Sequence, residues 1–172
     1  MGFLKNTRML VLLAMLVALN IVLTRFLSIE VPTQRVSLHF LPIALSAIFF
    51  GPIPAAIAAM VADVVGFALF ARGAFPFFPG FTLSQFIMGA IYGLVLYQKP
   101  INMARVSVAA LLVTLIVNMG FNTLWVSILT GNPFVPMLLF RAPVNVVMFG
   151  VQVLMITVSW RYLHRLSEEG TR

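Results

Sequence analysis

Asp63 is the residue whose chemistry most needs an explanation, because it is a carboxylate within the apolar stretch 55–70. An ionisable side chain at membrane depth is costly. It normally faces a protein interior, a partner or a cavity, and so indicates a functional site. We therefore expect Asp63 to belong to a binding site for which the rest of the chain is the scaffold.

Arginines are the second group with binding chemistry. Four of them are predicted to lie toward the outer side of a membrane: Arg25, Arg35, Arg72 and Arg141. Four guanidinium groups facing one membrane-depth acid leave positive charge uncompensated, which indicates an anion site. Guanidinium groups bind carboxylates through a two-pronged set of N–H donors. In the structural alternative, Asp63 forms an internal ion pair with Arg25 or Arg141.

Polar and aromatic side chains recur at helical spacing around these charges. Residues three, four and seven apart share one face of a helix. Such faces are expensive against lipid and should turn inward, although amides are also ordinary links between membrane helices. The predicted binding residues are Asp63, Arg25, Arg35, Arg72, Phe67, Gln85, Asn118, Asn122, Trp125, Arg141 and Asn145.

This set of residues suits an anionic ligand that carries a flat ring. Trp125 or Phe67 could stack on the ring, and the carboxylate of Asp63 could accept paired N–H groups from a heterocycle. No thiol chemistry is available, since the chain has no cysteine. Metal-protease and nucleotide-binding motifs are also absent. His39 is expected to be a packed or wall residue, so we predict no metal site and no enzyme.

The elements that must position these groups are membrane helices. Hydrophobic residues make up 62% of the 172 residues, charged residues 9%, and the mean hydropathy is +1.08. Soluble domains average about 45–50% apolar and about 25% charged residues. The net charge of +7 is scattered between apolar runs, without the basic stripe expected of a nucleic-acid partner. The chain is therefore predicted to be an integral membrane protein.

Six apolar stretches predict an all-α fold with six transmembrane helices, forming a single domain over residues 1–172. A polar interruption at 28–35 follows the first stretch, which we interpret as a retained span rather than a cleaved signal peptide. With both termini cytoplasmic, the cytoplasmic side carries seven lysines and arginines and the outer side carries four, which favours that orientation. The predicted spans are about 9–26, 36–50, 55–70, 83–97, 106–129 and 137–160.

Small residues are spaced for close helix contact in three of these spans, including Ala55/Ala59 and Ala58/Ala62 in the third. Ala14 and Ala18 are four apart in the first span, and Gly89 and Gly93 are four apart in the fourth. Such pairs let two helix backbones approach in lipid. Internal packing is the ordinary explanation for them.

Four segments together resemble a known family: RFLSIEVPTQRVSL at 25–38, FFGP at 49–52, FPGFTLS at 78–84 and GAIYG at 89–93. They are similar to the folate-specific substrate-binding subunits of energy-coupling-factor vitamin importers. The resemblance implies capture of folate from outside a bacterial plasma membrane, with loops after helices one, three and five closing over the vitamin. It also implies docking, through Ala14 and Ala18, on a transmembrane coupling subunit that works with two cytoplasmic ATPases.

The working pose places the glutamate tail of folate on the arginines and its pterin on Asp63. No cofactor is expected besides folate as the transported ligand. Two alternatives remain open: a subunit for another vitamin, and a stand-alone secondary transporter. Four arginines disfavour a cationic vitamin such as thiamin. The lack of an inverted repeat, and of a second membrane-depth acid for proton coupling, disfavours the transporter.

Overall fold

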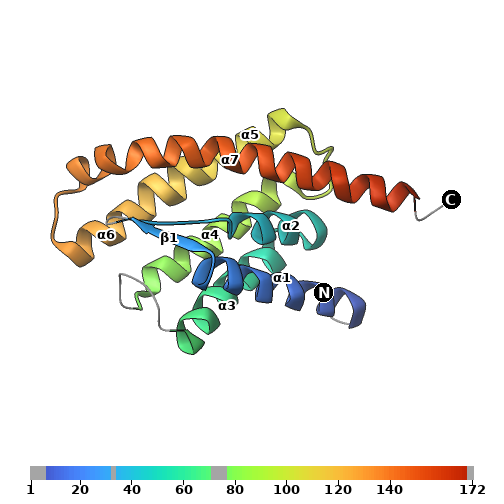
Figure 1. Cartoon of the computed structure of the whole chain (residues 1–172), viewed down its shortest axis with the longest axis horizontal. Helices are drawn as coiled ribbons and strands as arrows, with labels where there is room; N and C mark the ends of the chain where they lie inside the picture. The colour runs from blue at the N-terminus through green and yellow to red at the C-terminus, as the bar shows by residue number, and fades with distance from the viewer. Residues whose placement is uncertain (1–6, 32–33, 71–76, 170–172) are drawn as a thin grey trace.

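The computed structural model describes residues 7–31, 34–70 and 77–169, and helices dominate them. Figure 1 shows the last helix, orange to red, along the longest axis of the molecule, with the green helices oblique to it. Five helical stretches in the described part are long and apolar enough to cross a membrane. The membrane class predicted from composition is thus supported. The helices are α1 (Thr7–Arg25), α2 (Phe40–Phe50), α3 (Pro52–Leu69), α4 (Pro79–Leu96), α5 (Met103–Leu112), η2 (Val113–Phe121), α6 (Asn122–Thr130) and α7 (Phe134–Glu169).

A small β-hairpin occupies the polar interruption after α1, and the prediction did not anticipate it. Strands β1 (Ser28–Val31) and β2 (Gln34–Ser37) pair antiparallel, with Ser28 opposite Ser37. The expected helix from residue 36 is therefore wrong at its beginning, because β2 runs through Ser37. Pairing two strands satisfies backbone N–H and C=O groups that an isolated irregular segment would leave unpaired at a membrane.

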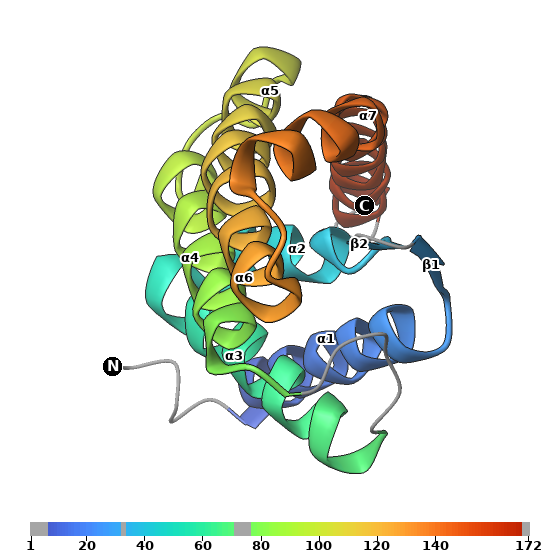
Figure 2. The ribbon, with the colours of Figure 1, turned by 90° about the vertical axis from the view of Figure 1, so that its left-hand side faces the viewer.

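Helix α2 is short but central. Its 11 residues rise about 16 Å at 1.5 Å per residue, less than the roughly 30 Å of a bilayer core. It nevertheless packs against α1, α3, α4 and α7, and eight of its residues are buried. Figure 2, viewed from the hairpin end, shows α2 inside the surrounding helices. This burial explains why a helix too short to span alone is almost entirely apolar.

The two ends of the long axis differ in what they carry. In Figure 1 the beginning of α1 and the end of α7 lie toward one end. The β-hairpin and the end of α6 lie toward the other. The hairpin and α2 together therefore return the chain along the axis after α1, as a full span would.

Glycines on α4 allow a close contact with α3. A Cβ atom added to Gly93 would lie 2.2 Å from Cα of Pro52, and one added to Gly89 would lie 2.7 Å from the carbonyl oxygen of Ala55. Both obstacles are backbone atoms at the start of α3, which side-chain rotation cannot move. The expected small-residue contact in this span is confirmed.

Replacing Gly93 by alanine should lower the stability of the purified protein by about 1–3 kcal/mol, because overpacking forces α3 and α4 apart. The matched control is Gly150→Ala in α7, where an added Cβ meets nothing within 4 Å. Thermal unfolding in detergent measures both. An unchanged melting temperature for Gly93→Ala would show that the α3–α4 contact is looser than described.

Candidate functional site

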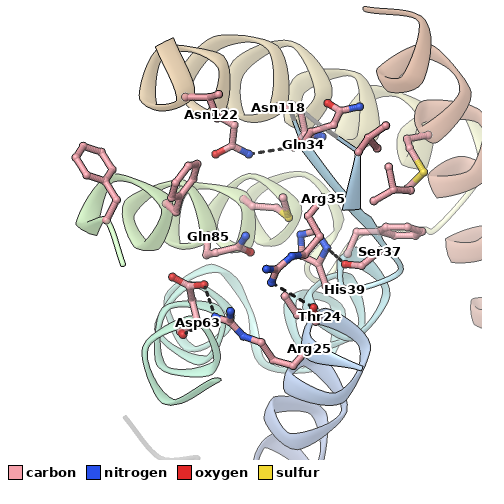
Figure 3. Close-up of a pocket in the computed structure, with 18 of the residues that line it drawn as sticks. Thr24, Arg25, Gln34, Arg35, Ser37, His39, Asp63, Gln85, Asn118 and Asn122 are labelled. Atoms are coloured by element: carbon pink, nitrogen blue, oxygen red, sulfur yellow. Dashed lines mark hydrogen bonds and ion pairs between the residues drawn. The ribbon is translucent and has the colours of Figure 1, made fainter. Parts of the chain in front are cut away.

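One cavity collects most of the predicted residues. It lies between the hairpin and helices α1, α3, α4, η2, α6 and α7, and its volume is about 190 Å³. A water molecule needs about 10–15 Å³ on this measure, so the cavity can hold an organic ligand. Figure 3 shows the labelled side chains converging on this space from both sides. The predicted residues that line it are Arg25, Arg35, Asp63, Phe67, Gln85, Asn118, Asn122 and Arg141.

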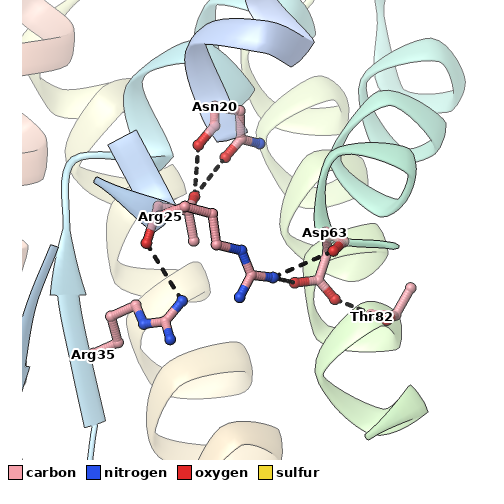
Figure 4. A network of polar contacts seen from close by, with 6 residues as sticks. Asn20, Arg25, Arg35, Asp63 and Thr82 are labelled. Carbon is pink, nitrogen blue, oxygen red and sulfur yellow. Dashed lines mark hydrogen bonds and ion pairs between the residues drawn. The ribbon is translucent and has the colours of Figure 1, made fainter. Parts of the chain in front are cut away.

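Asp63 forms an ion pair within the cavity wall. The Nη2 atom of Arg25 lies 3.6 Å from its Oδ1 atom, and the two side chains are 5% and 18% exposed. Thr82 at the start of α4 donates a hydrogen bond to Oδ2 at 2.8 Å. Figure 4 shows this chain of contacts joining α1, α3 and α4. The ion pair and the cavity position were separate hypotheses from sequence, and the structure combines them.

Arg25 also faces an aromatic surface. Its guanidinium carbon lies 5.6 Å from the ring centre of Phe67, within cation–π range. Phe67 in turn contacts Phe77, with ring centres 5.2 Å apart. Phe78 and Phe81 add further rings to the same wall. A flat ligand ring could stack here.

Arg35 reaches the cavity from β2. Its Nη1 atom donates to the backbone oxygen of Thr24 at 3.3 Å, next to Arg25 at the end of α1. Figure 4 shows the guanidinium group of Arg25 pointing to Asp63 and that of Arg35 beside the end of α1. The hairpin therefore adds a second cation close to the first.

Arg141 connects the hairpin to α6 and α7. This side chain is 4% exposed and donates from Nε to Gln34 at 3.1 Å and from Nη1 to Thr123 at 3.1 Å. Asn145 donates to the same Gln34 oxygen at 3.4 Å. Asn145 thus supports Gln34 and Arg141 from outside the described cavity wall. Gln34 was missed from sequence because it lies in a segment interpreted as a connecting loop.

A wide helical turn positions the two asparagines. The backbone N–H of Asn122 bonds to the carbonyl oxygen of Val117, five residues back, as in a π-helix. Such segments are frequent at functional sites. Asn122 donates to Asn118 at 3.4 Å, and both line the cavity.

Trp125 lies outside the described cavity wall, although regular helical spacing put it beside Asn118. Its indole N–H donates to Ser84 at 3.1 Å, and its ring packs on Phe78 and Phe121. The extra residue in the turn at η2 rotates everything after it, which explains the difference. Arg72, the remaining predicted residue, lies outside the described residues.

Several buried polar atoms on the cavity wall have no hydrogen-bond partner among the described residues. They are Nε2 of His39, Oε1 of Gln85 and Oδ1 of Asn122. Buried polar groups in native proteins are normally paired, so atoms of this kind call for a ligand or ordered water. Of these three residues, His39 was predicted as a wall residue but not as a binding residue.

Charge on the described cavity wall is unbalanced, since three guanidinium groups and one carboxylate line it. Histidine has an ordinary pKa of about 6.5, so His39 adds little charge at pH 7. The wall retains a net positive charge beside aromatic rings. These features define a class: a helical membrane protein with an internal site suited to anionic ring compounds.

Comparison with known proteins gives the family. The family model for the substrate-specific component of ECF transporters matches residues 8–165. The chain belongs to this family, whose members are transport components rather than enzymes, as the sequence predicted.

Individual relatives are folate transporters. The chain is 38% identical over 162 residues to the folate transporter FolT of Clostridium novyi, covering 94% of this chain and 93% of that protein. It is also 38% identical over 154 residues to FolT of Leuconostoc mesenteroides, covering 86% and 82%. A crystal structure of FolT bound with folic acid superposes with a TM-score of 0.81 at 37% identity, covering 88% of this chain and 91% of that one.

Proposed function

We propose that this protein is the folate-binding subunit of an ECF-type importer and captures folate with high affinity. The observation that supports this proposal best is a cavity with net positive charge and aromatic walls in a chain 38% identical to a folate transporter. Folate matches both features, since it has a dianionic glutamate tail and a pterin ring system. The protein itself carries out no catalysis.

Two of the three guanidinium groups on the described cavity wall, those of Arg25 and Arg35, meet at the end of α1, and this grouping supports a pose. Arg25 and Arg35 come from the end of α1 and from the hairpin, whereas Gln85 and Asn118 are neutral amides on α4 and η2. A dianion is expensive to bury away from cations, so the tail belongs with the arginines. The pterin then lies on Asp63, as in the working pose, with the amides beside it.

Transport requires partners of the kind that the family supplies. We propose a transmembrane coupling subunit and two cytoplasmic ATPases, with folate entering from the extracellular side of a bacterial plasma membrane. The hairpin and α2 complete a six-helix arrangement in which both termini are cytoplasmic. The near alignment of the start of α1 with the end of α7 supports this orientation (Figure 1). So does the excess of lysine and arginine on that side.

Equilibrium binding to the detergent-purified protein tests the proposal. Folic acid should bind with a dissociation constant in the micromolar range or tighter, without any partner subunit. Thiamin, a cation, is the control and should not bind, because the cavity wall is positive. A monodisperse, cooperatively unfolding sample that binds no folic acid would contradict the proposal.

A further inference from the structure

His39 presents a nitrogen to the cavity for which the described protein offers no partner. The residue lies in the turn between β2 and α2, and its ring lines the cavity. Its Nδ1 atom lies 2.7 Å from the hydroxyl oxygen of Ser37. Its Nε2 atom is buried and has no hydrogen bond among the described residues. The imidazole is therefore positioned through Nδ1, and Nε2 is available for a hydrogen bond to a ligand.

This arrangement orients the ring as a binding group would need. Ser37 is itself buried, with 5% exposure, and lies on the strand that carries Arg35. Figure 3 shows His39 beside Arg35 and turned toward the space between α4 and the hairpin, with its bond to Ser37 on the far side. A ring nitrogen fixed by a neighbour sets which role the other nitrogen can take. A buried nitrogen without a partner is costly, so a bound molecule is its natural complement.

We propose that His39 is a specificity-determining residue of this site, and that its Nε2 atom hydrogen-bonds the ring system of the bound ligand while Ser37 holds the imidazole in position. The proposal rests on the proposed function, because the ligand is taken to be folate.

The ring rather than the tail is the expected contact because of charge. An ordinary imidazole is mostly uncharged near neutral pH, and burial disfavours its charged form, so His39 gains little Coulomb attraction to a carboxylate. Arg25 and Arg35 supply that attraction on the same wall. A neutral imidazole instead offers one donor or one acceptor, according to its tautomer, and pterin nitrogens and N–H groups match either.

Binding by wild type and three variants tests this role with three probes. The probes are folic acid, pteroic acid, which lacks the glutamate, and p-aminobenzoylglutamate, which lacks the pterin. His39→Phe keeps an aromatic ring without nitrogen and should weaken folic acid and pteroic acid equally, by about 10-fold or more. The affinity for p-aminobenzoylglutamate should stay within about 2-fold, since the tail contacts are intact.

Two conservative variants distinguish a hydrogen bond from His39 to the ligand from a packing role of its ring. His39→Gln replaces the imidazole by a group that can donate and accept, and should recover part of the lost affinity. Ser37→Ala removes the partner of Nδ1 and should weaken pterin compounds by a smaller factor than His39→Phe. Melting temperatures of all variants show whether they fold. If His39→Phe fails to fold, the ratio between pteroic acid and p-aminobenzoylglutamate in the other two variants decides.

Wild-type affinity of His39→Phe for folic acid would overturn the proposal while leaving the folate function in place. Equal loss of p-aminobenzoylglutamate would also overturn it, because His39 would then act on the tail or on packing. Failure of the wild type to bind folic acid would instead reject the proposed function, and this proposal with it.

Discussion

Replacing both Ala14 and Ala18 by leucine should abolish folate uptake by cells and leave folate binding by the purified protein unchanged. Both alanines are exposed on α1, rather than packed inside the described fold. Large apolar neighbours such as Met15, at 64% exposure, are also exposed on this helix. A small-residue face without an internal partner suits close approach by a helix of another subunit. We propose that this face docks on the coupling subunit.

Leucine side chains would hold the partner backbone away from α1, so transport should be lost while folate binding is retained. Uptake of labelled folate in cells that also express the coupling subunit and ATPases measures transport, and equilibrium binding measures the site. Ala68→Leu is the control, since it makes the same type of substitution at an exposed alanine on α3. If the double variant lost binding, the face would be internal packing. If it retained uptake, docking would lie elsewhere.

Asp63→Asn should weaken folic acid binding by about 10–100-fold, which corresponds to about 1.4–2.8 kcal/mol. The substitution keeps the shape but removes the negative charge 3.6 Å from the guanidinium of Arg25. A buried cation whose carboxylate is removed is strongly destabilised and reorganises. The variant should therefore also melt at a lower temperature, because the pair joins α1 to α3.

The same variant also tests the proposed position of the pterin on Asp63. If Asp63 accepts N–H groups of the pterin, pteroic acid and folic acid should lose affinity by the same factor. If pteroic acid binds as well as before, Asp63 acts on the tail through Arg25, and the ring has been placed wrongly. Thr82→Val is the control, since it removes the 2.8 Å hydrogen bond to Asp63 and keeps the charge. Its effect on affinity should be clearly smaller.

Much of the site chemistry could be predicted because it depends on residue type. An acid in an apolar stretch must face inward, and arginines in excess of acids imply an anion. The sequence left Arg25 and Arg141 as candidate partners for an ion pair with Asp63, and in the structure Arg25 forms it. The Gly89–Gly93 contact was likewise predictable, since small residues four apart form a continuous groove on any regular helix. The sequence pattern did not show whether an ion pair of Asp63 would fill the site or line a cavity. In the structure the ion pair lines the cavity.

The positions of several side chains depended on departures from regular helix. The wide turn at η2 rotates Trp125 relative to Asn118, and helical spacing cannot reveal such a turn. The β-hairpin replaced the expected beginning of the second helix and carried Gln34 to Arg141, more than one hundred residues away in sequence. Contacts between residues so far apart in sequence depend on how the whole chain packs, and local sequence does not reveal them.

Sequence alone therefore predicted the membrane environment, since hydropathy and charge are sums over residues and do not need coordinates. It also predicted that the polar groups suit an anion with a ring. Only the tertiary structure decided which groups share a wall. His39 illustrates the difference: the open nitrogen and its orientation by Ser37 arise only where β2 meets α2, from a backbone geometry set by strand pairing and burial.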